Sequence, residues 1–192
     1  MNQIAERPDG YLPELIEYSF GLPLQPGTDP SSAAQAAILP EGFQLHGVVD
    51  LVEKGASANR RMTDHKTGKN RMEGGLIIGQ GEMLQPVLYS LALQQLLGAA
   101  VAEGRFIFLF CTAAGGYTES AVVMNDRAGE YGVKALKVID QAVETGFLPA
   151  AAKKDGCKWC NFGCICGPYE ELRVSGKNQA ALAELLELRE MQ

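Results

Sequence analysis

Residues 43–69 read FQLHGVVDLVEKGASANRRMTDHKTGK, and this stretch decides the fold that the sequence predicts. Over residues 43–53 the side chains alternate between two faces, which is the period of a β-strand. Residues 55–59 have the composition of a turn, and residues 60–67 then return as a second strand. The stretch is therefore predicted to form an antiparallel hairpin that ends at Gly68.

The rest of the chain alternates between helical and strand-like patterns. The strongest helical signal is a long run rich in Leu, Ala and Gln without β-branched clustering. The further predicted elements are a short helix at 13–20, a helix at 84–103, strands at 105–112 and 117–124 around a turn at 113–116, and helices at 126–145 and 178–192. Two hairpins interleaved with helices indicate an α/β or α+β domain, and we assign the α/β class with a mixed central sheet flanked by helices.

Composition limits the function classes. The chain has 192 residues, 46% of them apolar, so it can build one core, and collagen-like or disordered classes are excluded. No apolar run approaches the roughly 18 to 20 residues that span a bilayer, and residues 1–10 do not resemble a signal peptide. We therefore expect no membrane partner and a cytoplasmic location.

Charge is distributed unevenly. The net charge of −6 argues against binding nucleic acid through overall charge. Residues 54–71, however, contain six basic side chains and a single acid, Asp64. A polyanion would meet this segment first, although a solvated hairpin face remains the alternative interpretation.

Two carboxylates and a lysine are predicted to converge on this hairpin. Asp64 and Lys66 are two residues apart on one strand and share a face, and the neighbouring strand can bring Asp50 beside them. Close carboxylates repel unless a cation lies between them, and carboxylate oxygens prefer Mg²⁺ or Mn²⁺. Such an ion activates water for attack on a phosphate, and the Lys66 ammonium can stabilise the developing charge. The alternative is an exposed hairpin with incidental charges.

One helix face and one cysteine-rich loop add further candidates. Gln85 and Tyr89 are four residues apart, so they share a helix face that can contact a base or steady Lys66; an ordinary exposed face is the alternative. Four cysteines lie within ten residues, which favours a metal or cluster site over a disulfide framework. They are Cys157, Cys160, Cys164 and Cys166. Cys111 stands apart in an apolar run and is expected in the core.

Four short motifs occur in a characteristic order. They are Gly47-Val-Val-Asp50, Asp64-His-Lys66-Thr-Gly-Lys69, Gln85-Pro-Val-Leu-Tyr89, and Cys157-Lys-Trp-Cys160 followed by Cys166. In this order they resemble the motifs of RecB-family nucleases of the PD-(D/E)xK superfamily, with the nearest likeness to the nuclease domain of AddB-type helicase-nuclease subunits. The resemblance covers about residues 17–177 and implies a restriction-endonuclease-like α/β fold.

The resemblance also implies roles for individual residues. Asp50, Asp64 and the backbone carbonyl of His65 would be metal ligands, and Lys66 would be the catalytic lysine. Gln85 and Tyr89 would form the helix motif of the family. The cysteines Cys157, Cys160 and Cys166 would be three ligands of a [4Fe-4S] cluster, with Cys164 as a bystander or substitute. A four-thiolate Zn²⁺ site and unligated thiols remain alternatives, because thiolates suit zinc and iron-sulfur clusters alike.

The implied activity is a Mg²⁺- or Mn²⁺-dependent DNA exonuclease of recombination and double-strand-break repair, which acts on single strands or ends with a helicase subunit or domain as partner. We expect a single domain over residues 1–192 with a cluster loop at 150–177. The family usually carries a metal-binding His on a helix before the segment resembling residues 17–21, and we expect this helix to be missing. Two alternatives follow, a catalytically silent DNA-binding scaffold and a zinc-binding interaction domain.

Overall fold

The computed structural model describes residues 10–68, 70, 75–109, 116–158 and 160–192. Five strands form one sheet in the order β1-β4-β5-β6-β7. These strands are β1 (Leu12–Phe20), β4 (Gly47–Lys54), β5 (Arg60–Lys66), β6 (Val101–Phe108) and β7 (Thr118–Val123). Strands β5 and β6 are parallel and the other pairs are antiparallel, so the sheet is mixed, as predicted.

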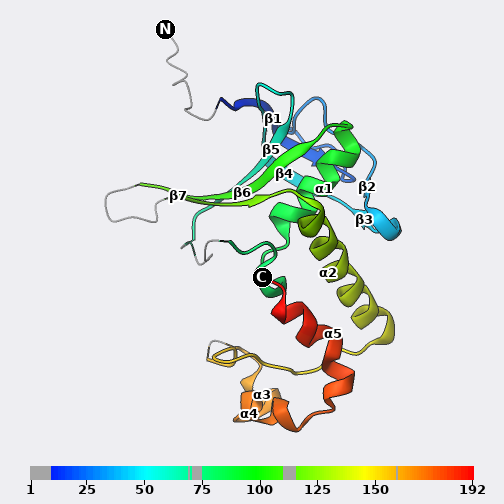
Figure 1. Cartoon of the computed structure of the whole chain (residues 1–192), viewed down its shortest axis with the longest axis vertical. Coiled ribbons are helices and arrows are strands. Elements are labelled where there is room, and N and C mark those ends of the chain that lie inside the picture. Colours follow the sequence, from blue (N-terminus) through cyan, green and yellow to red (C-terminus); the bar gives the residue numbers. More distant parts are fainter. Residues whose placement is uncertain (1–9, 69, 71–74, 110–115, 159) are drawn as a thin grey trace.

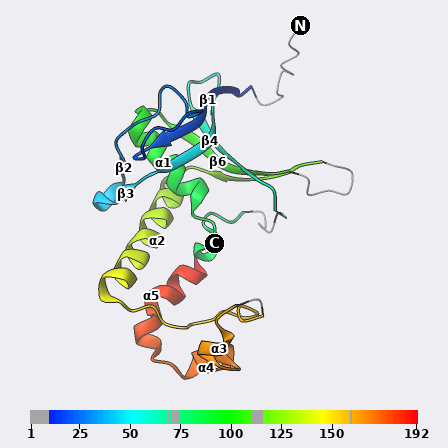
Figure 2. The same cartoon turned by 180° about the vertical axis from the view of Figure 1, so that it is seen from behind.

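Helices lie beside the sheet and extend away from it. They are α1 (Gln85–Leu97), α2 (Asp126–Thr145), α3 (Gly163–Cys166), α4 (Glu170–Arg173) and α5 (Gln179–Glu190). Short elements complete the described chain: β2 (Ala37–Ile38), β3 (Gln44–Leu45) and the 3-10 turns η1 (Pro40–Gly42), η2 (Gly79–Gly81) and η3 (Val174–Gly176). In Figure 1 the sheet occupies one end of an elongated molecule, α2 runs away from it, and α3, α4 and α5 form the other end. Figure 2 shows the same arrangement from behind.

The helix predicted at residues 13–20 is wrong, because this segment is strand β1. It pairs with β4 in an antiparallel register that places Ile16 opposite Leu51 and Tyr18 opposite Val49. Tyr18 is buried in the main core cluster, whereas Ile16 is exposed. Pairing with a strand about thirty residues away therefore overrides the local helical preference of the segment.

The helix predicted at residues 84–103 is too long at its end. Helix α1 stops at Leu97, where Gly98 adopts the left-handed conformation typical of a residue that ends a helix. Strand β6 then begins at Val101, four residues before the predicted start. Helix α1 is thus the crossover that connects the parallel strands β5 and β6.

Other predicted elements are confirmed. The hairpin of β4 and β5 pairs Leu51 with Thr63, and β6 pairs with β7 in an antiparallel register. Helix α2 has the predicted bounds, with the Asn125 side chain accepting a hydrogen bond from the Ala128 amide at its start. The prediction that Cys111 is buried and most of the predicted turn at 113–116 lie outside the described residues.

Helix α1 packs closely on one face of the sheet. A Cβ at Gly104 of β6 would lie only 2.3 Å from the Pro86 carbonyl oxygen in the first turn of α1. Any larger residue would push the helix off the strand, so glycine fixes the distance between them. The start of α1 is therefore held directly over the middle of the sheet.

Helix α5 and Met191 connect the end of the molecule that holds α3 and α4 to the end that holds the sheet. Leu188 of α5 and Met191 belong to a buried cluster with Ile78, Val87 and residues of α2. The Gln80 amide also donates to the Met191 carbonyl at 2.9 Å. Among the helices that the structure describes, none is long and apolar enough to cross a membrane.

Candidate active site

Asp50 lies where the hydrogen-bonded ladder between β4 and β5 ends. The last residue pair of that ladder is Leu51 with Thr63, and Asp50 and Asp64 are the adjacent residues on the two strands. The His65 amide instead donates to Oδ2 of Asp50 at 2.7 Å. The carboxylate thus takes the place of a backbone acceptor, and this hydrogen bond holds Asp50 against the strand that carries Asp64.

Asp64, Lys66 and Gln85 form a closed set of contacts. Nζ of Lys66 lies 2.6 Å from Oδ2 of Asp64 and donates to Oε1 of Gln85 at 2.8 Å. Nε2 of Gln85 donates to Oδ1 of Asp64 at 2.6 Å. The first residue of α1 therefore contacts both Asp64 and Lys66, which lie on the same face of β5.

The surroundings of Asp64 disfavour the ionised form of its carboxyl group. Its side chain is only 6% exposed, and burial, opposed by the contact with Lys66 and reinforced by the charge of Asp50, raises the pKa of Asp64. Within the described part of the chain, the partner of its buried Oδ2 is the Lys66 ammonium. A raised pKa beside a second carboxylate means that an added cation would stabilise the ionised form of Asp64.

Tyr89 lies one turn further along α1, behind the carboxylates. Burial, followed by the charges of Asp64 and Asp50, raises the pKa of Tyr89. Its hydroxyl occupies the space over Gly47, where a Cβ would lie 2.5 Å from it. The ring also contacts Phe20 edge-on, with centroids 5.7 Å apart. Tyr89 therefore holds the start of β4 against α1 and keeps its hydroxyl protonated near neutral pH.

His65 lies beside Asp50, because its Nδ1 is 3.4 Å from Oδ2 of that residue. The imidazole is partly exposed, so its side chain is a neighbour of the carboxylate pair and not part of the core. The prediction that the His65 carbonyl binds a metal stays a prediction.

A divalent ion fits these side chains. The described residues contain no group of three His, Cys, Asp or Glu side chains placed to hold a metal. Two carboxylates on adjacent strands, with the charge of Asp50 raising the pKa of Asp64, suit Mg²⁺ or Mn²⁺, which keeps several waters and binds through one or two carboxylates. Asp50 and Asp64 would hold such an ion.

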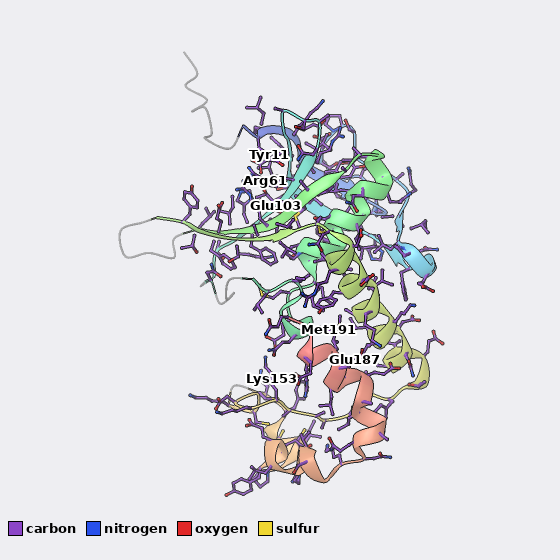
Figure 3. The ribbon with its side chains drawn as sticks, in the orientation of Figure 1. Tyr11, Arg61, Glu103, Lys153, Glu187 and Met191 are labelled. Carbon is purple, nitrogen blue, oxygen red and sulfur yellow. The ribbon has the colours of Figure 1, made fainter. Side chains whose placement is uncertain are left out.

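A buried ionic network lies on the opposite face of the sheet and was missed by the sequence reasoning. Glu53, which is fully buried, accepts hydrogen bonds from Arg61 at 2.9 Å and from Arg105 at 2.8 Å. Arg105 also donates to Oγ1 of Thr63 at 2.9 Å. Arg61 lies between Tyr11, whose ring it covers, and Glu103, as Figure 3 shows.

We call this network the clamp, because it holds β5 from the face of the sheet opposite Asp64 and Lys66. Burial alone would raise the pKa of Glu53, but hydrogen bonds from Arg61 and Thr63 and the two arginine charges outweigh burial and lower it. Thr63 directly precedes Asp64, so the backbone that carries the carboxylate and lysine is fixed from both faces. The sequence placed Glu53 and Arg61 on the two strands of the predicted hairpin, but their partner Arg105 could not be assigned before β5 and β6 were known to pair.

A cavity of about 480 Å³ opens next to Lys66. Its walls include Thr67, Gly68, Met83, Phe106 and Phe108. The Lys66 ammonium lies 5.0 Å from the centre of the Phe106 ring, and both residues line the cavity, so the cavity is adjacent to the carboxylate site.

The cysteines do not converge. Cys157, Cys160 and Cys164 are exposed, Cys166 is half-buried, and all four are free thiols. The Glu171 carboxylate accepts hydrogen bonds from the amides of Asp155 and Cys157, which fixes the first cysteine of the loop. Since no three described ligand side chains form a metal-holding group, this geometry does not support the predicted [4Fe-4S] cluster or the Zn²⁺ alternative.

Comparison with known proteins agrees with the geometry of the carboxylate site. A family model described as the PD-(D/E)XK nuclease superfamily matches residues 2–167. No curated protein matches the sequence. The matched range includes all five strands of the sheet, the Asp64-His-Lys66 motif and the start of α1. The chain therefore belongs to the PD-(D/E)XK nuclease superfamily.

Proposed function

We propose that this chain is a metal-dependent deoxyribonuclease that hydrolyses phosphodiester bonds at the site formed by Asp50, Asp64 and Lys66. The observation that carries the proposal is that Gln85 joins Asp64 and Lys66, while the His65 amide holds Asp50 on the adjacent strand. Mg²⁺ or Mn²⁺ bound by Asp50 and Asp64 would polarise a phosphoryl oxygen and lower the pKa of a bound water.

The protein's own groups supply the remaining functions. The Lys66 ammonium stabilises the negative charge that develops on the phosphate, and the contacts of Gln85 orient both Lys66 and Asp64. Tyr89 and the hydrogen bond from the His65 amide keep α1, β4 and β5 at fixed distances. Substrate is thus met by a preorganised lysine and does not have to assemble the site.

The biological setting is a further part of the proposal. We infer an exonuclease that acts on single strands or DNA ends in recombination and double-strand-break repair, in the cytoplasm, with a helicase subunit or domain as partner. Four motifs in the order of the AddB-type RecB-family nucleases support this assignment. The C-x2-C-x5-C spacing belongs to the same resemblance, and the loop would have to close for its thiols to bind a cluster or zinc.

Cleavage of labelled DNA with purified parent and Lys66→Ala tests the proposal. The parent should cleave with Mg²⁺ or Mn²⁺ and stop on addition of a chelator, and Lys66→Ala should be slower by about 10² to 10³-fold, the usual loss for one transition-state donor. The matched control is Lys134→Ala, because Lys134 also forms an ion pair and its side chain is 35% exposed against 37% for Lys66. Equal cleavage by Lys66→Ala and Lys134→Ala would contradict the proposal. DNA binding without cleavage by the parent would instead support the silent scaffold.

A further inference from the structure

We propose that a groove between helices α2 and α5 is a docking site for a basic amphipathic helix of a partner protein. We call it the α2-α5 groove, and its volume is about 530 Å³. Its apolar lining includes Val138, Ala142, Phe147, Leu148, Ala181 and Leu185. In Figure 1, α5 lies beside α2 and away from the strands that carry the carboxylates. The groove is therefore a surface that the proposed nuclease chemistry does not use.

The groove has the length of a short helical segment. Its lining on α2 extends over residues 138–145, and its lining on α5 extends over residues 180–189. At a rise of 1.5 Å per residue these two walls are about 10 and 13 Å long. Apolar anchors at positions i, i+3, i+4 and i+7 of a docked helix span about 10 Å. A helix that lies along the groove can therefore place one complete set of anchors in it.

The apolar side chains of the groove are accessible in the free protein. Gly146 ends α2 in the left-handed conformation, and the next two residues, Phe147 and Leu148, form a third wall. Leu148 is 75% exposed and Phe147 is 45% exposed. Single exposed apolar residues are ordinary, but a group of them at the mouth of a groove marks an interaction site. A docked helix would cover both side chains and gain their burial.

Acidic side chains surround the groove and determine the charge of the partner. Residues 138–149 and 178–192 contain five acids and one base, which gives −4 of the net charge of −6 on the chain. The acids are Asp140, Glu144, Glu184, Glu187 and Glu190. All five are exposed, and Glu184 lines the groove itself. This surface attracts Lys and Arg side chains and repels nucleic acid and anionic lipid, so the docked helix is basic beside its apolar face.

Nearby basic side chains do not cancel this charge. Arg189, the one base in these two segments, donates a hydrogen bond to the Ala151 carbonyl. Lys134 precedes the groove on α2 and pairs with Glu187 at 3.1 Å. Four of the five acids thus remain against one arginine, and the excess of negative charge persists.

A second copy of this chain fits the groove less well than a basic helix. A symmetric contact would place the same surface of two copies face to face. The acids of one copy would then lie against the acids of the other, and such like-charge contacts disfavour association. Helix α5 also lies outside residues 2–167, the range that matches the nuclease family. The groove thus adds a surface to the part of the chain that the family shares.

The experiment measures peptide binding by fluorescence anisotropy in the absence of metal and DNA. The probe is a labelled peptide of Leu and Lys whose Leu residues recur at positions i, i+3, i+4 and i+7. One control peptide has the same composition in an order without an apolar face, and the other has Glu in place of Lys. The parent should bind the probe at least about tenfold more tightly than either control.

Leu148→Ser tests whether the probe binds in the groove. Loss of the contact of one buried Leu side chain should weaken binding about 10- to 100-fold. Leu172→Ser is the matched control, because Leu172 is 73% exposed and lies in α4, outside the lining of the groove. It should bind the probe like the parent. Both replaced side chains are exposed, so thermal melting should show that both variants are as stable as the parent.

Three outcomes would overturn the inference: no binding of the probe, equal binding of the three peptides by the parent, or equal affinities of Leu148→Ser and Leu172→Ser for the probe. Sedimentation of the parent alone tests the occupant further. A monomer is expected, and a dimer that Leu148→Ser dissociates would assign the groove to a second copy instead. None of these measurements involves DNA cleavage, so the inference and the proposed function fail separately.

Discussion

Replacement of Glu53 by Gln should be one of the most destabilising conservative changes in the sheet. Glu53 is fully buried and is the shared anion of Arg61 and Arg105, which are themselves about 5% exposed. The substitution keeps the shape of the side chain but leaves two buried guanidinium groups without their common carboxylate. Breaking a buried ion pair by removing one partner costs about 3–5 kcal/mol.

Glu119 provides the internal control for this experiment. It forms an ion pair with the same Arg105 at 2.9 Å, but its side chain is 52% exposed. Exposed pairs contribute about 0–1 kcal/mol, so Glu119→Gln should have a small effect. In urea denaturation at neutral pH, Glu53→Gln should lose about 3–5 kcal/mol of unfolding free energy, and its melting temperature should fall by about 6–20 °C.

The pH dependence gives a second test of the same reasoning. Because the pKa of Glu53 is lowered in the folded protein, its stabilisation is present above the ordinary glutamate pKa of about 4.3 and is lost as the pH falls through the lowered value. The difference between parent and Glu53→Gln should therefore shrink in acid. Equal stability losses in Glu53→Gln and Glu119→Gln at neutral pH would refute the assignment of the network as a buried clamp.

Two further variants test the carboxylate site and the helix that covers it. Asp64→Asn should raise the melting temperature at neutral pH in the absence of metal, because the raised pKa of Asp64 means that its ionised form costs stability as the pH rises above about 3.9. The gain in melting temperature should vanish near pH 3, and Mn²⁺ should stabilise only the parent. A variant that is less stable than the parent at neutral pH would contradict this prediction. In urea denaturation, Gly104→Ala should lose about 1–3 kcal/mol or more of unfolding free energy, because the new methyl group would lie 2.3 Å from the Pro86 carbonyl oxygen. The control Gly176→Ala has open surroundings and should change the unfolding free energy by less than about 1 kcal/mol. A Gly104→Ala protein as stable as this control would show that α1 can move away from β6.

Local patterns predicted the elements whose neighbours are close in sequence. The β4-β5 hairpin was readable because a short turn joins two strands, and the end of α2 was readable because Gly146 follows its last residue. Strand β1 could not be recognised, since residues 13–20 become a strand only through pairing with β4. The parallel pairing of β5 with β6 likewise depends on a crossover through α1, which no local pattern reveals.

The same distinction applies to the site. The proximity of Asp64 and Lys66 follows from a two-residue spacing on a strand, and the sequence was enough to propose that Gln85 could steady Lys66. The hydrogen bond from Gln85 to Asp64 required the position of α1 over β5. The clamp formed by Glu53 and Arg105 joins residues 52 positions apart and required the strand order. The cysteine spacing predicted a ligand group that the described loop does not form, because spacing alone does not fix where four thiols point.

Calorimetric titration of Mn²⁺ tests most directly whether the two strand carboxylates form a divalent-ion site. The parent and Lys66→Ala should each show a saturable binding heat, and Asp50→Asn and Asp64→Asn should each lose it while remaining folded. Binding to either aspartate variant with the affinity of the parent would contradict the central claim, because the ion would then be held elsewhere in the protein.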